Sequence, residues 1–149
     1  MIKVAPGDPR HPEARALLEQ SHALMRTLFP AESNHFLSID DLIADHVTFL
    51  VAKRNGKIVG TGALAHKGRY GEVKSMFVDE AARGEGIAGK ILDTIERIAR
   101  DQGLPKLMLE TGNSLHAAHR LYERHGFTYC SVFGDYADDP LSLFMEKAL

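Results

Sequence analysis

Polar and apolar residues follow two patterns along this chain, one typical of strands and the other of helices. Short runs rich in β-branched and apolar residues, separated by turn residues, predict strands. The predicted strands cover residues 2–4, 47–53, 57–65, 72–78, 106–110, 127–133 and 141–146. The second and third strands are joined by Arg54, Asn55 and Gly56. Because Asn-Gly favours a tight hairpin turn, we expect these two strands to pair antiparallel.

Apolar residues at helical spacing predict the helices. Pro12 opens the first helix and Pro30 ends it, and its apolar positions are Ala16, Leu17, Ala23, Leu24 and Leu28. The second helix carries a stripe of Ile87, Ile91, Leu92, Ile95, Ile98 and Ala99, before Gly103 and Pro105. Residues 114–125 form a third helix, and Asp40 and Asp41 are suited to cap a fourth, short one.

The order of these elements predicts the fold class. Antiparallel strands come first and a β-α-β-α-β succession follows, so we expect an α+β fold around one mixed sheet. The chain has 149 residues, of which 44% are hydrophobic, and this is enough to build the core of one ordinary domain. We therefore expect residues 1–149 to form a single domain.

Charge and cysteine content narrow the function classes. A formal net charge of −2 lacks the excess of basic residues that a nucleic-acid surface needs. One cysteine, Cys130, excludes an internal disulfide framework and fits a reducing compartment. The first residues carry no signal-peptide pattern, and no apolar run approaches the ~20 residues of a membrane span. We expect a cytoplasmic protein without nucleic-acid or membrane partners.

The segment VDEAARGEGIAGK, residues 78–90, is the main candidate for a binding site. Glycines between a strand and a helix leave backbone N–H groups free to bind an anion at the positive end of the helix dipole, and Arg83 adds a charge. A dinucleotide fingerprint fits poorly, because five residues separate the strand from Gly84. A P-loop also fits poorly, because Ile91 stands where a Ser or Thr should coordinate magnesium.

A third interpretation rests on two motifs in order. Arg83, Gly86 and Ala88 form Arg-x-x-Gly-x-Ala after a strand, and this resembles the coenzyme A loop of the GNAT superfamily of N-acetyltransferases. LYERHGF, residues 121–127, resembles that superfamily's second signature. The resemblance covers residues 47–149, and LETG (109–112) and the segment 133–147 look like a bacterial branch whose substrates are unsettled.

The resemblance implies a mixed, mostly antiparallel sheet of about six to seven strands flanked by about four helices. It implies acetyl-CoA as co-substrate, no metal, and a possible homodimer. By this resemblance the cofactor arm lies along the strand at Met76, Phe77 and Val78. The residues expected at its phosphates are Arg83, Gly84, Glu85, Gly86, Ile87, Ala88 and Gly89.

Two catalytic residues follow from positions shared with the family. Tyr122 is expected to protonate the departing sulfur, since a phenol is a neutral donor at pH 7; the alternative is a tyrosine that only packs its helix. Glu72 is the candidate general base, with Glu110 in reserve and a water chain as a further possibility. The alternative for Glu72 is an edge charge paired with Lys74.

Two features leave the resemblance incomplete. Many members carry an Asn seven residues before the tyrosine that contacts the cofactor arm, and this chain has Leu115 at that position. Asn113 is the candidate to make this cofactor contact instead. Eight histidines are present, among them His116, His119 and His125, but no metal-binding pattern accompanies them. Surface or capping histidines are therefore the better interpretation.

Substrate choice in the superfamily resides mainly near the first helices, here residues 28–41. Their acidic and aromatic content suggests a small amine, an amino acid or a peptide N-terminus. We expect an N-acetyltransferase that transfers acetyl directly in a ternary complex, because Cys130 has no evident base to make it a nucleophile. The alternatives are a non-catalytic acyl-CoA sensor and a nucleotide-binding module.

Overall fold

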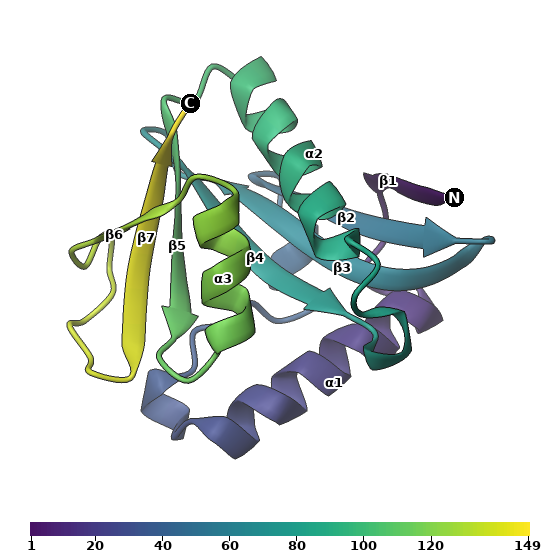
Figure 1. Cartoon of the computed structure of the whole chain (residues 1–149), viewed down its shortest axis with the longest axis horizontal. Helices are drawn as coiled ribbons and strands as arrows, with labels where there is room; N and C mark the ends of the chain where they lie inside the picture. The colour runs from purple at the N-terminus through teal and green to yellow at the C-terminus, as the bar shows by residue number, and fades with distance from the viewer.

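A seven-stranded sheet with the order β1-β2-β3-β4-β5-β7-β6 forms the centre of the structure, a computed structural model that describes residues 1–149 (Figure 1). Its strands are β1 (Ile2–Pro6), β2 (Val47–Arg54), β3 (Lys57–His66), β4 (Gly71–Val78), β5 (Lys106–Gly112), β6 (Thr128–Cys130) and β7 (Ser142–Ala148). Every neighbouring pair is antiparallel except β4 and β5. The predicted mixed, mostly antiparallel sheet is confirmed.

The hairpin between β2 and β3 also forms as predicted. Arg54 pairs with Lys57, and the two residues between them, Asn55 and Gly56, have φ angles of 53° and 79°. A tight two-residue turn of this kind needs positive φ at both positions, which Asn and Gly adopt at least cost. The Asn-Gly dipeptide therefore sets the register of the hairpin.

Three α-helices surround the sheet, fewer than the four expected. They are α1 (Pro12–Leu28), α2 (Ile87–Asp101) and α3 (His116–Arg124). The short helix expected near Asp40 and Asp41 is a single 3-10 turn, η2 (Asp41–Ile43), which ends because Ala44 is extended. Two more such turns are η1 (Ala31–Ser33) and η3 (Glu80–Ala82). None of the α-helices combines the length and apolar character that a membrane crossing requires.

The buried face of α1 differs from the prediction. Ala14, Leu17, Leu18 and His22 are buried, whereas Leu24 and Leu28 are 39% and 45% exposed. Ala14, Leu17 and Leu18 belong to the hydrophobic cluster on the sheet, and Ser21 and Met25, further along α1, line a cavity. The helix forms as predicted, but of its five predicted apolar positions only Leu17 is buried, because the face that packs inward is not the one that carries Ala16, Ala23, Leu24 and Leu28.

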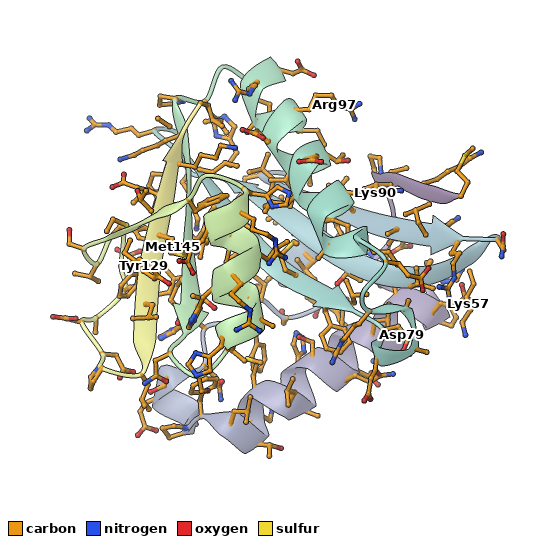
Figure 2. All side chains as sticks on the ribbon, viewed as in Figure 1. Lys57, Asp79, Lys90, Arg97, Tyr129 and Met145 are labelled. Carbon is orange, nitrogen blue, oxygen red and sulfur yellow. The ribbon has the colours of Figure 1, made fainter.

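Two hydrophobic clusters fix the helices on opposite faces of the sheet. Ile58 and Val59 are adjacent on β3 yet belong to different clusters, because successive side chains of a strand point to opposite faces. One cluster packs α1, and the other packs α2 and Tyr122 of α3. The α2 stripe is buried as predicted except for Ile98, which is partly buried. Lys90 and Arg97 point outward from α2 (Figure 2).

The contact between α2 and β3 is unusually close. A Cβ atom at Gly62 would lie 2.4 Å from Cγ2 of Ile91, so no larger residue fits there without movement. Full burial of an Ile or Leu side chain contributes about 1.5–3 kcal/mol, and Ile91 and Ile95 are both fully buried. Packing therefore fixes the N-terminus of α2 beside the end of β4.

Candidate active site

The two parallel strands of the sheet, β4 and β5, separate soon after they begin. They pair only at Gly71 with Leu107 and at Glu72 with Met108. Beyond this point β4 is distorted by a register shift against β3, where Ser75 adopts a φ of 57° and its carbonyl accepts a 2.8 Å hydrogen bond from the Thr61 hydroxyl. Because bulges bend and twist a strand, the end of β4 diverges from β5, and the edge of β4 that faces β5 has no strand partner there.

A groove of about 790 Å³ lies beside this open edge. Its lining residues come from the end of β4, the loop before α2, helix α3 and the second half of α1, elements whose positions Figure 1 shows. All but one of the residues expected at the cofactor phosphates and arm line it. These are Met76, Phe77, Val78, Arg83, Gly84, Gly86, Ile87, Ala88 and Gly89. The structure therefore brings together the two parts of the predicted binding segment.

The loop before α2 presents free backbone N–H groups to the groove. Gly84 and Gly86 have φ angles of 84° and 77°, and a Cβ atom at either would meet no other atom within 4 Å. Glycine is thus required by the backbone conformation and not by lack of space. Gly86 is the N-cap of α2, and no side chain caps it, so the first N–H groups of the helix remain available to an anion.

Two charged residues of this loop point in different directions. The Arg83 guanidinium donates a 3.1 Å hydrogen bond from Nε to the Val78 carbonyl and lies 5.4 Å from the centre of the Phe77 ring. Glu85 instead forms an ion pair with Arg54 and does not line the groove. Of the two, only Arg83 is placed to meet an anionic ligand. Asp79, labelled in Figure 2, starts the preceding turn by accepting a hydrogen bond from the Ala81 N–H.

A second, smaller cavity of about 150 Å³ opens between the separated strands and α1. It shares a short boundary with the groove, formed by Ser21, Met25, Met76, Leu115, Ala118 and Tyr122. Its far wall is polar and comes from β4, β5 and the segment after α1. The polar residues of that wall are Ser33, Asn34, His35, Lys74, Ser75, Glu110 and Thr111.

Tyr122 stands at the boundary of the two spaces. Its side chain is only 6% exposed, and its ring packs edge-on against Phe127 with the centres 5.7 Å apart. Burial raises the pKa of Tyr122 well above that of a free phenol, and the nearby Glu110 charge adds to this shift. The hydroxyl therefore stays protonated at neutral pH, which a hydrogen-bond donor requires.

Glu72 lies deeper in the sheet than its predicted role suggests. It is 4% exposed, does not line the small cavity, and accepts a hydrogen bond from the Tyr136 hydroxyl. The Lys74 ammonium lies 3.5 Å from its carboxylate and donates 2.9 Å hydrogen bonds to the Tyr136 hydroxyl and to the His35 carbonyl. The anticipated pairing with Lys74 is present, but in a buried position and not at a solvated edge.

Glu110 occupies the position that a base beside the cavity needs. It lines the cavity near the end of β5 and takes part in none of the chain's ion pairs. Burial raises the pKa of the Glu110 carboxyl above its ordinary value. Since a stronger base has a higher pKa, this environment makes Glu110 a better proton acceptor than a free glutamate.

The structure does not bring Asn113 to the groove. Its side-chain amide donates a 3.3 Å hydrogen bond to the Pro140 carbonyl, and its backbone N–H bonds to Leu141, so it links the end of β5 to the start of β7. Ser114 and Leu115 line the groove instead. Among the histidines, His119 bonds the Gly112 carbonyl at 2.8 Å, and no group of acidic, histidine or cysteine side chains is arranged to hold a metal.

Several residues of the site were not anticipated from the sequence. His116 and Arg124 of α3 add basic groups to the groove, and Tyr136 and Ser75 belong to the surroundings of the small cavity. The Ser75 hydroxyl is buried without a hydrogen-bond partner. Spacing gave a signal only for Lys74, which follows Glu72 by two residues and so shares its face of the strand. The remaining residues meet only through the tertiary fold.

Comparison with known proteins agrees with this architecture. The model of the acetyltransferase (GNAT) family matches residues 15–127. An Azospirillum brasilense protein named IAA acetyltransferase is 44% identical over 99% of this chain and 98% of its own length. A Klebsiella pneumoniae structure described as an acyl-CoA N-acyltransferase superposes with a TM-score of 0.84 at 33% identity, covering 100% of this chain and 98% of that one.

The chain therefore belongs to the acetyltransferase (GNAT) family, whose members are N-acyltransferase enzymes. An Elizabethkingia anophelis acetyltransferase of the same family, with acetyl-CoA bound, shares the fold at a TM-score of 0.70 and 20% identity, covering 99% of this chain and 98% of that one. The family and its acyl-CoA-dependent relatives support acetyl transfer from acetyl-CoA as the activity class.

Proposed function

We propose that this protein is an acetyl-CoA-dependent N-acetyltransferase that acts on a small primary amine by direct transfer in a ternary complex. The observation that carries this proposal is the meeting of a large groove and a small polar cavity at Tyr122, beside the open edge of β4. A reaction between two bound molecules requires such a shared boundary, because the reacting atoms must come together.

The groove fits coenzyme A in both its charge and its backbone geometry. The uncapped N-terminus of α2 and the Arg83 guanidinium suit a pyrophosphate, and Arg124 supplies a further positive group. The unpaired edge from Met76 to Val78 can hydrogen-bond an extended amide chain as an added strand would. When bound, acetyl-CoA supplies an acetyl thioester, and the groove would hold it with this end at Tyr122.

Two side chains can then handle the protons. Glu110 accepts a proton from the bound ammonium group, which gives the nitrogen the electron pair with which it attacks the acetyl carbon, and the nitrogen loses its second proton to solvent as the amide forms. When the carbon–sulfur bond breaks, the Tyr122 hydroxyl donates its hydrogen to the departing sulfur. Because the pKa of Tyr122 is raised, a hydrogen bond to the thiolate carries much of this stabilisation until solvent completes the protonation.

Direct transfer follows from the lack of an activated nucleophile near the groove. Cys130, the only cysteine, lies on β6 and lines neither space. Burial and the Glu146 charge raise the pKa of its thiol, which lowers the fraction of reactive thiolate. We therefore propose that no acetyl-enzyme forms on Cys130. Homodimerisation and a cytoplasmic location stay predictions.

The test is thiol release from acetyl-CoA against a panel of amines, amino acids and polyamines, together with IAA, which the Azospirillum relative's name gives. Tyr122→Phe keeps the ring and removes only the hydroxyl, so we expect turnover on the accepted amine to fall at least about tenfold. Tyr129→Phe is the matched control, since Tyr129 is 52% exposed on β6 (Figure 2). Cofactor binding without turnover on any acceptor would contradict the proposal and favour a sensor.

A further inference from the structure

The small cavity is lined by two side chains of opposite charge type, the amine of Lys74 and the carboxyl of Glu110. An α-amino acid acceptor would need both: a carboxylate for its ammonium group and a cation for its own carboxylate. Whether each charge is free to bind a ligand therefore determines which amines the cavity accepts.

Lys74 is held and neutralised by the protein. The Lys74 ammonium donates hydrogen bonds to the His35 carbonyl and the Tyr136 hydroxyl, both at 2.9 Å, and forms an ion pair with the Glu72 carboxylate at 3.5 Å. The side chains of Lys74 and Glu72 are 10% and 5% exposed, so each is the buried counter-ion of the other. The Tyr136 hydroxyl completes this arrangement by donating to Glu72.

The surroundings hold this cluster in place. Tyr136 packs edge-on against His35, with ring centres 5.1 Å apart, and also against Phe133 and Phe144. Nearby, the Ser33 hydroxyl donates a 2.6 Å hydrogen bond to Asp139, which links the same two chain segments a second time. Turning Lys74 toward a ligand would break bonds that join β4 to both segments.

Glu110 is in the opposite situation. It lines the cavity, forms no ion pair, and faces a Lys74 charge that Glu72 already neutralises. A cationic ligand would therefore supply the missing counter-charge of Glu110. An anionic ligand would meet an unpaired carboxylate and no free cation.

We propose that the acceptor is a small primary ammonium whose neighbouring groups are uncharged, bound through Glu110, and that free α-amino acids are rejected. This inference rests on the proposed N-acetyltransferase function and names its substrate class. The cavity volume of about 150 Å³ limits the reacting end to a few heavy atoms, so the group next to the amine must itself lie close to Glu110.

Alaninamide and alanine test this inference, because they differ mainly in the charge beside the amine. Their dissociation constants are measured by calorimetry at pH 7.0 with the protein saturated with CoA, which has no acetyl group to transfer. Binding, unlike turnover, is not dominated by the different basicity of the two amines. We expect alaninamide to bind at least about tenfold more tightly than alanine.

Glu110→Gln then tests the cause of the preference. It keeps the shape of the side chain and removes its charge, so the ratio of the two dissociation constants should fall to within about threefold. Glu19→Gln is the control, because Glu19 is a 60% exposed partner of Arg15 on α1. Tyr136→Phe frees one N–H donor of Lys74 and should improve alanine binding relative to alaninamide. An unchanged ratio in Glu110→Gln would overturn the role of Glu110.

The outcomes separate the two proposals. Thiol release from acetyl-CoA with alaninamide but not alanine supports both. Equal or tighter binding of alanine, with turnover of either compound, would overturn the substrate class alone and point to His35, the remaining cavity residue able to carry a positive charge. If no amine binds and none is turned over, the N-acetyltransferase function fails, and the substrate class fails with it.

Discussion

Replacing Glu72 and Glu110 with glutamine should have opposite consequences, because the two carboxylates differ in their partners. Glu72 is the buried counter-ion of Lys74, and removing one partner of such a pair costs about 3–5 kcal/mol. Lys74 keeps its hydrogen bonds to Tyr136 and the His35 carbonyl, so we expect a loss near 3 kcal/mol, the lower end of that roughly 3–5 kcal/mol range. At about 2–4 °C per kcal/mol, the melting temperature of Glu72→Gln falls by about 6–12 °C.

Glu110→Gln should leave the melting temperature unchanged or raise it at pH 8. Glu110 has no cation to lose, and burial already disfavours its charged form, as its raised pKa shows. Its turnover, in contrast, should fall by about 10² or more, since a positioned general base contributes about 10²–10⁴ to the rate. For folded Glu72→Gln protein we expect a loss of activity well below this, because Glu72 does not line the cavity.

Thermal unfolding followed by far-UV circular dichroism, and thiol release at 25 °C, measure the two effects on the same samples. Glu19→Gln should change neither quantity, since its ion pair is exposed. The opposite result, in which Glu72→Gln abolishes turnover at an unchanged melting temperature while Glu110→Gln stays active, would contradict these roles. Glu72 would then be the base, as its position on the strand first suggested.

Three further predictions follow from the site. The acidic limb of the kcat/KM profile should lie above the ordinary glutamate pKa of about 4.3, because Glu110 must be deprotonated to act and its pKa is raised. Between the ordinary pKa and the raised one, the Glu110 carboxyl is protonated in the native state but not in the unfolded state, so the free energy of unfolding should fall as the pH rises through this range. Arg83→Ala should raise the KM for acetyl-CoA by about tenfold with a smaller change in kcat, measured by varying acetyl-CoA at saturating amine. Gly112→Ala would place a Cβ 2.2 Å from the ring of Phe29, which lines the cavity. We expect a raised KM for the amine and a free energy of unfolding lowered by about 1–3 kcal/mol through overpacking, and unchanged kinetics would show that Phe29 moves aside freely.

Local signals predicted most of the fold. The strand–turn–strand pattern around Asn55 and Gly56, the stripe on α2 and the glycines before it are all encoded within a few residues of one another, and the structure confirms these elements. The predictions fail where tertiary packing determines the length of an element or the face that it buries. β6 (Thr128–Cys130) is shorter than the seven residues expected, because β7 pairs it only along Thr128–Cys130.

The site was predictable only where it is continuous in sequence. The phosphate loop lies within one segment, so spacing alone placed Arg83 and the glycines together. The small cavity instead combines residues from α1, β4, β5 and α3, with Tyr136 behind its wall. The sequence placed Glu72 ahead of Glu110 as the base, but spacing does not show which carboxylate faces the cavity and which is already paired with a cation.

Initial rates with acetyl-CoA and the accepted amine both varied test the central claim most directly, when the thiol and the N-acetylated amine are quantified together. The account predicts equal amounts of the two products and intersecting double-reciprocal lines, because both substrates must be bound before transfer. Parallel lines, or an acetylated protein recovered by intact-mass spectrometry in the absence of amine, would contradict direct transfer across the boundary at Tyr122.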